Sequence, residues 1–190
     1  MKQEDEILMS LWAKKKECAG QFLWLPLIVH LQDTMGVMHF LWHHWVSEGQ
    51  KQIIIHSLSS EKTEVEDPAC CLACFLAGVH DLGKCTPVFQ TQKGYQNSPD
   101  LDMALLERME FIGLHGISGM NEIFNADIRK RTHHTITGEY LLHCFGVQQD
   151  IASIIGAHHG KPADANDIVT DLKAYPSSCF QENQGPLHET

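Results

Sequence analysis

Histidine and aspartate fall at the expected ends of helices in this sequence, and these residue types can bind metal ions. His80–Asp81 and His158–His159 each follow an apolar helical segment. His30 and His134 lie where two other helices are expected to begin. Imidazole nitrogen and carboxylate oxygen together suit divalent transition metals such as iron, manganese, nickel and zinc. One carboxylate can bridge two ions, and ions about 3.5–4 Å apart can hold the attacking and the leaving oxygen of a phosphodiester.

Each of these residues also has an ordinary structural interpretation. A buried histidine is more often hydrogen-bonded in a core than bound to metal, and a His–Asp dipeptide arises by chance in many chains. The whole series favours a metal centre, because gathering several such groups inside an apolar bundle is costly unless something binds them. The histidines interpreted instead as packed or solvated side chains are His39, His43, His44, His56, His115, His143 and His188.

The elements expected to position the series are helices joined by loops. Apolar residues recur every three or four positions in Leu31–Val46, which predicts an amphipathic helix. Asp67–Pro68 is a typical helix start, and Ala69–Val79 predicts a helix buried on all sides that stops near Gly83. No convincing β-hairpin and no internal repeat is found. Further helices are expected at Asp100–Met109, from Thr132 to about Cys144 and at Gln148–His158, and Gly113–Asn125 is ambiguous.

The composition is that of a globular chain. Its 190 residues are 43% hydrophobic and 20% charged, which excludes a disordered protein and fits one domain. The formal net charge of −10 argues against unaided coating of nucleic acid, because sequence-independent affinity comes from Lys and Arg. No secretory signal is recognised, and Phe22–Val29, the longest apolar stretch, is too short to cross a membrane.

The cysteines indicate a reducing compartment. There are 7, an odd number, and several lie in apolar helical text, which is typical of free thiols in a cytoplasm. Cys71 and Cys74 form a CxxC pair, but a redox or zinc role would need a βαβ context or a second ligand pair. Neither is recognised, so both are interpreted as small apolar residues of a buried helix.

Several short segments around the predicted metal ligands share a recognisable pattern. They are HDLGK at His80–Lys84 followed by FQ at Phe89–Gln90, IIGAHHG at Ile154–Gly160, His134 with Gly138 and Leu141, Leu11–Lys14, and His30–Asp33. Over about residues 8–162 they resemble the HD nuclease domain of the CRISPR-associated helicase-nuclease of type I systems. Two of these segments, Leu11–Lys14 and His30–Asp33, are similar to the type I-E subgroup of that family.

This resemblance implies an all-α fold, an HD-domain helical bundle with the metal site at its centre. It implies cleavage of single-stranded DNA with one or two divalent ions of iron, manganese, nickel or cobalt. Asp81 and Lys84 would act in catalysis, with Lys84 facing a phosphate oxygen, and His133 is an alternative to His134. The implied ligands are His30, His80 and Asp81 for one ion, and Asp81, His134, His158 and His159 for the other.

The expected partners are single-stranded DNA, a helicase domain or subunit and the CRISPR surveillance complex, with no membrane and in the cytoplasm. The family normally carries a further aspartate after the HHG segment. Here Asp164, Asp167 and Asp171 could take its place, and no phosphate-binding GxxxxGK[ST] loop follows. We therefore expect an HD domain at residues 1–165 and a loose tail at 166–190, in a fragment or split subunit shortened before the last aspartate motif and the helicase.

Two other functions remain open at this level. A different HD phosphohydrolase, acting on a nucleotide or cyclic nucleotide, would use the same ligands in a closed pocket. A domain that lacks its last aspartate could instead be an inactive interaction module. Metal-dependent turnover separates the module from the two enzymes, and cleavage of a circular strand separates the nuclease from the nucleotide hydrolase.

Overall fold

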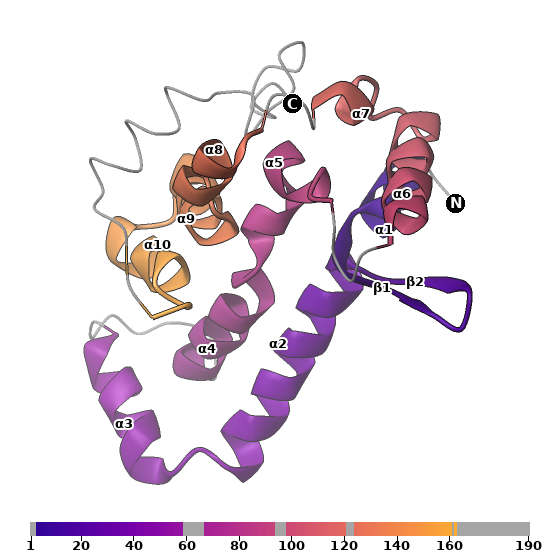
Figure 1. The fold of residues 1–190 in the computed structure, drawn as a ribbon. Helices are drawn as coiled ribbons and strands as arrows, with labels where there is room; N and C mark the ends of the chain where they lie inside the picture. The colour runs from indigo at the N-terminus through magenta and orange to yellow at the C-terminus, as the bar shows by residue number, and fades with distance from the viewer. Residues whose placement is uncertain (1–2, 59–66, 94–97, 121–123, 161, 163–190) are drawn as a thin grey trace.

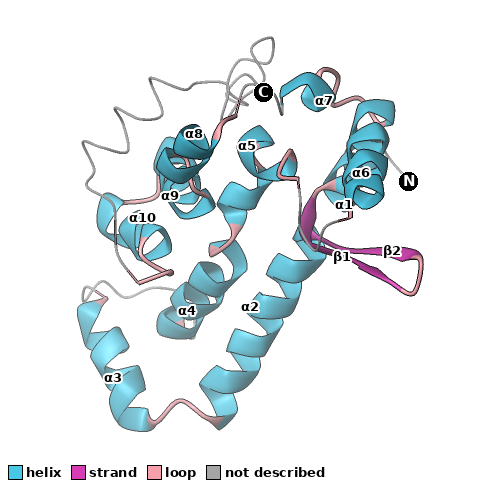
Figure 2. Ribbon diagram, in the orientation of Figure 1, coloured by secondary structure: helices cyan, strands magenta, loops and turns pink. Residues whose placement is uncertain are grey.

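The computed structural model is almost entirely helical, as the sequence predicts (Figures 1 and 2). It describes residues 3–58, 67–93, 98–120, 124–160 and 162. The predicted tail and Asp164, Asp167 and Asp171 lie outside the described residues. The elements are α1 (Gln3–Ser10), β1 (Trp12–Cys18), β2 (Gln21–Pro26), α2 (Leu27–His44), α3 (Glu48–Ser57), α4 (Pro68–Val79), the 3₁₀ helix η1 (Leu82–Cys85), α5 (Pro87–Gln90), α6 (Pro99–Phe111), α7 (Ile117–Met120), α8 (Ala126–Arg131), α9 (His134–Cys144) and α10 (Gln149–Gly156).

The β-hairpin formed by β1 and β2 corrects the expectation that no hairpin is present. The strands pair antiparallel, with Lys15 opposite Trp24, and the turn places Gly20 at a positive φ. The sequence did not reveal this hairpin. Its first strand contains a run of three lysines, and the burial of one of them, Lys15 (3% exposed), could not be expected from the sequence. Its ammonium lies 2.7 Å from the carboxylate of Asp102 on α6, so the charge is buried with a partner that is distant in sequence.

Helices α2 and α4 lie side by side and antiparallel in the middle of the molecule (Figure 1). α2 begins at Leu27, four residues before the predicted start, directly after Pro26 ends β2. α4 spans Pro68–Val79, and its N-cap Asp67 accepts a hydrogen bond from the Cys70 backbone N–H at 2.9 Å. The predicted helix is confirmed, but its burial on all sides is not, because Phe75 is 37% exposed.

Two further groups of elements pack against this helix pair (Figures 1 and 2). On one side α9 packs on α10 and on η1, with Leu142, Ala152 and Ile155 in its core. On the other side the hairpin, α1 and α6 surround a core that contains Trp12 and Phe89. This packing brings η1 together with the N-terminal ends of α2 and α9 and the C-terminal ends of α4 and α10.

The remaining helix predictions differ from the structure mainly at their ends. α6 spans Pro99–Phe111 where Asp100–Met109 was expected, and α10 ends at Gly156, two residues early. α9 is capped by His133 rather than by Thr132. The ambiguous segment contains only the short helix α7 among its described residues. No helix in the described part of the chain combines the length and apolar character needed to cross a bilayer.

Candidate metal centre

The side chain of Asp81 lies at the centre of the predicted site and is 4% exposed. Its Oδ2 lies 2.9 Å from His30 Nε2, 3.2 Å from His80 Nε2 and 2.6 Å from Lys84 Nζ. His30 comes from the first turn of α2, whereas His80 and Asp81 directly follow α4. The antiparallel packing of α2 on α4 therefore brings the start of one helix to the end of the other, as a shared site requires.

The other carboxylate oxygen of Asp81 faces a second set of imidazoles. Asp81 Oδ1 lies 3.3 Å from His134 Nε2 and 3.6 Å from His158 Nε2. His134 Nε2 in turn lies 3.1 Å from His159 Nε2. His134 is the first residue of α9, and His158 and His159 follow α10 after its C-cap Ala157. The packing of α9 on α10 thus supplies this half of the site.

All of the sequence-predicted site residues therefore lie together around one carboxylate. Ligand atoms of His30, His80 and Asp81 lie within 4.8 Å of one another, and so do those of His134, His158 and His159. His133, the sequence alternative to His134, instead caps α9, and its Nδ1 contacts the Thr135 hydroxyl at 3.1 Å. The arrangement is two ligand groups with Asp81 between them, which fits a carboxylate that bridges two cations.

Backbone carbonyls set the tautomers of two of these histidines. His80 Nδ1 donates to the carbonyl of Ala77 at 2.8 Å, and His158 Nδ1 donates to that of Ile155 at 2.6 Å. A carbonyl only accepts, so Nδ1 carries the proton and the neutral ring offers the Nε2 lone pair to the site. His158 Nε2 is buried and has no hydrogen-bond partner among the described residues. An unpartnered nitrogen aimed at a carboxylate is costly by itself and is explained by a cation between them.

The electrostatics of the site also suit cations. Burial alone would raise the pKa of Asp81, but the close contacts of its carboxylate with His134, His80 and Lys84 outweigh burial and hold this pKa well below its usual range. Burial lowers the pKa of His30 and of His158, so these rings are neutral near pH 7. The carboxylate is therefore anionic and these imidazoles are uncharged, which are the protonation states that ligate metals.

Gln90 connects the hairpin to the site, a role that reasoning from the sequence did not assign. Its Oε1 accepts from the Trp12 backbone N–H at 3.1 Å. Its Nε2 donates to the carbonyls of Trp12 at 3.0 Å and of Lys84 at 2.6 Å. The side chain is 2% exposed, so these bonds form away from water. The signal was present as the FQ segment, but its contacts require the folded chain.

A pocket of about 460 Å³ opens beside the second ligand group. Lys84, His134 and His159 form its inner wall, and the exposed Lys14 and Lys93 contribute positive charge to its rim. The full lining is Trp12, Ala13, Lys14, Lys15, Lys84, Phe89, Gln92, Lys93, His134 and His159. An anionic ligand in this pocket would meet local lysines despite the net charge of −10.

A helical bundle that gathers histidines around a His–Asp pair is the architecture of an HD domain. The family model described as the Cas3 HD domain matches residues 12–184, and the chain belongs to this family. The chain is 49% identical over 173 residues to a CRISPR-associated nuclease/helicase Cas3 of Streptococcus thermophilus, covering 91% of this chain and 18% of that protein. It is 28% identical over 166 residues to a CRISPR-associated endonuclease/helicase Cas3 of Thermus thermophilus, covering 86% and 16%.

The chain thus spans less than a fifth of the length of these curated relatives. No solved structure gave a significant match. HD-domain membership implies a bound divalent metal, and the donor set described above fits one. Two features carry this fit: the buried His158 Nε2, which has no hydrogen-bond partner among the described residues, and the lowered pKa of the Asp81 carboxyl.

Proposed function

We propose that this chain is a metal-dependent nuclease domain that cuts single-stranded DNA in type I CRISPR interference. The observation that carries the proposal is the position of Asp81, whose Oδ2 faces His30 and His80 while Oδ1 faces His134 and His158. This arrangement supports two cations that share one carboxylate. Divalent iron, manganese, nickel or cobalt suits such nitrogen and oxygen ligands.

The ligand roles follow from the two groups. His30, His80 and Asp81 would hold one ion, and Asp81 with His134, His158 and His159 would hold the other. When bound, the ions would supply a nucleophilic water near neutral pH and neutralise charge on the scissile phosphate. The carbonyls of Ala77 and Ile155 keep the rings of His80 and His158 in the ligating tautomer.

Lys84 has two partners in this proposal. Its Nζ donates to Asp81 Oδ2 at 2.6 Å, and the same side chain lines the pocket beside His134. A phosphate oxygen in the pocket would compete for the ammonium, which binds phosphate as a point charge. Lys14 and Lys93 at the rim would contact the next phosphates along a strand.

The charge of the chain indicates how DNA would reach this pocket. A net charge of −10 disfavours strong autonomous DNA binding, so the strand would be delivered by other components. The relatives are named as fusions of a nuclease and a helicase, which supports a helicase domain or subunit as the delivering partner. We place the CRISPR surveillance complex of a type I-E system upstream of that step, in the cytoplasm.

The test uses metal-free protein and circular single-stranded DNA. Manganese, nickel, cobalt or anaerobic ferrous iron is added, with the His80→Ala/Asp81→Ala double variant as the control. Cleavage by the wild type alone supports the nuclease, because a circle has no ends for a nucleotide hydrolase or an exonuclease. A folded wild-type protein that cleaves with none of these metals would overturn the proposal, and turnover of nucleotides alone would favour another HD phosphohydrolase.

A further inference from the structure

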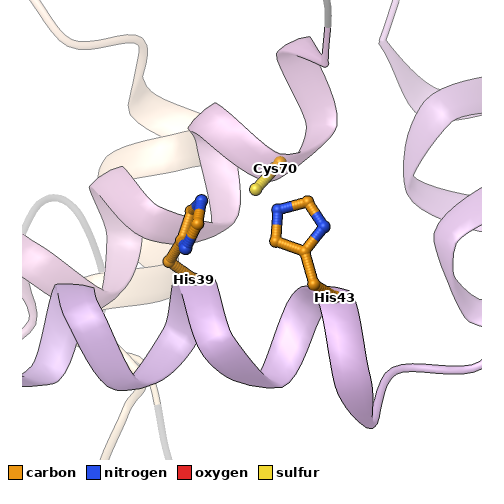
Figure 3. A group of neighbouring side chains, drawn as sticks. All are labelled: His39, His43 and Cys70. Carbon is orange, nitrogen blue, oxygen red and sulfur yellow. The ribbon is translucent and has the colours of Figure 1, made fainter.

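A second cluster of metal-binding residue types lies away from Asp81, where α2 and α4 pack together (Figure 3). It consists of His39 and His43 on α2 and Cys70 on α4. One ring nitrogen of each histidine and the Cys70 Sγ all lie within 4.8 Å of one another. Both rings rise from the same face of α2 toward the sulfur on α4 (Figure 3).

The spacing of the residues explains this convergence. His39 and His43 are four residues apart, so they lie one above the other on a helix, a spacing that chelates zinc in other proteins. Their ring centroids are 4.6 Å apart. Cys70 lies in the first turn of α4, which packs against the second half of the antiparallel α2. The sequence alone did not reveal the cluster, because the helix pairing brings its two parts together.

A second sulfur lies beside the first. Cys74 is one helical turn after Cys70, and the two Sγ atoms are 4.0 Å apart. Two sulfurs bound to one tetrahedral zinc ion at about 2.3 Å are separated by about 3.8 Å. The two thiols are therefore already spaced as ligands of one ion would be.

We propose that His39, His43 and Cys70 bind a zinc ion that joins α2 to α4, with Cys74 completing a tetrahedral set. Two nitrogens and two sulfurs are a typical ligand set of structural zinc sites. The same softness of the ligands disfavours magnesium, calcium and manganese. On binding, each thiol exchanges its proton for a bond to zinc, and the proton passes to the solvent.

The cluster is buried at its cysteine end and exposed to solvent at its histidine end. Cys70 is 6% exposed and packs with Trp42 and Ala69, whereas both imidazoles are exposed. Rotation of the two exposed rings can close the ligand separations without repacking the core. An ion can therefore enter from solvent at the histidines and be held at its inner side by sulfur.

The position of the cluster gives the ion a structural consequence. His39 follows His30 by nine residues on α2, a distance of about 14 Å along the helix axis. Cys70, in the first turn of α4, and His80, which follows the last residue of α4, are ten residues apart, or about 15 Å along the axis. A bond between the helices at one end would fix the relative position of His30 and His80 at the other. This proposal does not depend on the nuclease activity.

Cobalt(II) is the probe that separates this site from the centre at Asp81. A thiolate bound to cobalt gives a near-ultraviolet charge-transfer band, and the groups around Asp81 offer only nitrogen and oxygen ligands. We expect cobalt added to the metal-free, reduced wild-type protein to produce this band, and added zinc to remove it. The His80→Ala/Asp81→Ala variant should keep the band, so failure at either metal site is seen separately.

Matched variants on the same helices assign the ligands. Cys70→Ser and His43→Ala should weaken cobalt binding by more than the about 10–100-fold that loss of an outer-shell partner costs. The exposed neighbours provide the controls, because Cys71→Ser and His44→Ala should bind cobalt as the wild type does. Circular dichroism shows whether each variant is folded. If replacing the buried Cys70 unfolds the protein, the substitution of the exposed His43 still tests the site.

Two results would overturn the zinc site. One is a wild-type protein that gives no thiolate band with cobalt, and the other is an unchanged band in both folded Cys70→Ser and folded His43→Ala. An unchanged band in Cys74→Ser would remove Cys74 from the ligand set.

Discussion

Gly83 of η1 lies so close to the first turn of α9 that a methyl group on its Cα would overlap the carbonyl oxygen of His134. The same methyl group would lie 2.6 Å from the backbone nitrogen of Gly138. The hydroxyl of Thr137 donates to the Gly83 carbonyl at 3.3 Å. The two glycines thus allow backbone-to-backbone packing that holds His134 beside Asp81. This contact gives a physical reason for the glycine of the HDLGK segment and for Gly138, four residues after His134.

Replacing Gly83 by alanine should separate η1 from α9. Two of the three nearest neighbours of the new methyl group are backbone atoms that cannot rotate away, so we expect a loss of about 1–3 kcal/mol or more in the free energy of unfolding. Metal binding should weaken as well, because His134 would shift away from Asp81. Urea denaturation and metal titration of Gly83→Ala measure the two effects.

Gly36→Ala is the matched control for this substitution. Gly36 lies inside α2, and apart from its chain neighbours and the backbone of its own helix no atom of the described residues lies within 4 Å of its would-be Cβ. Alanine there should stabilise the protein by about 0.5–1 kcal/mol, because glycine is the poorer helix former. Equal stability of Gly83→Ala and the wild type would show that the close packing of η1 on α9 is wrong.

Lys84 should contribute to substrate binding more than to metal binding. Its Nζ lies in the pocket wall, and it is not part of either ligand group around Asp81. We expect Lys84→Met to raise the KM for DNA about tenfold, the equivalent of roughly 1.4 kcal/mol for one charge-assisted contact. Metal content at saturating metal should be unchanged. Steady-state kinetics and elemental analysis of the same preparation provide the measurement.

Lys51→Met removes an equal charge far from the pocket and serves as the control. Lys51 Nζ lies 5.9 Å from the Trp42 ring at the other end of α2. The KM of Lys51→Met for DNA should equal that of the wild type. Loss of bound metal in Lys84→Met would contradict the assignment and indicate that Lys84 organises Asp81 instead.

Gln90 should be essential to stability because its buried amide joins three backbone groups, two of Trp12 and one of Lys84. In Gln90→Leu the N–H of Trp12 and the carbonyl of Lys84 lose these hydrogen bonds. An unsatisfied buried group costs about 1–3 kcal/mol, so the variant should lose at least that much on urea denaturation. Gln52→Leu is the control, since the Gln52 amide donates to Glu48 on the exposed face of α3, and it should change stability by about 0.5 kcal/mol or less. Similar values for the two variants would contradict the role of Gln90.

Local sequence was sufficient to predict most of the helices and the grouping of site residues. Asp67–Pro68 specified the start of α4 through a cap and a fixed φ, and both effects act within one turn. The histidines at helix ends could be grouped because placing several such groups inside an apolar bundle is costly unless something binds them. The division of these histidines into two ligand groups that share Asp81 came from the resemblance to a family, because their spacing alone does not indicate it.

What could not be predicted depends on contacts between distant residues. Lys15 is buried because Asp102 pairs with it across 87 positions, so the hairpin had no local signal. Cys70 meets His39 and His43 only through the register of α4 on α2. CxxC spacing drew attention to Cys71 and Cys74, whereas the structure brings together the sulfurs of Cys70 and Cys74.

Glu139 on α9 carries a buried carboxylate that is only partly satisfied. Its Oε1 accepts from Gln149 Nε2 at 2.7 Å. Its Oε2 is buried, has no hydrogen-bond partner among the described residues, and lies where a methyl group on Gly156 would overlap it. Burial raises the pKa of Glu139, so the folded state binds a proton more tightly than the unfolded state does.

Glu139→Gln should therefore stabilise the metal-free protein in a pH-dependent way. A folded-state pKa above the unfolded value of about 4.3 costs the wild type stability as pH rises through that range, and glutamine does not titrate. We expect a gain of about 1 kcal/mol at pH 7 that disappears near pH 4, measured by urea denaturation at both values. Glu110→Gln should show the opposite sign, because hydrogen bonds from Ser118 and Gly116 outweigh burial and lower the pKa of Glu110. A gain for Glu139→Gln that is equal at both pH values would show that ionisation of this carboxylate is not its cause.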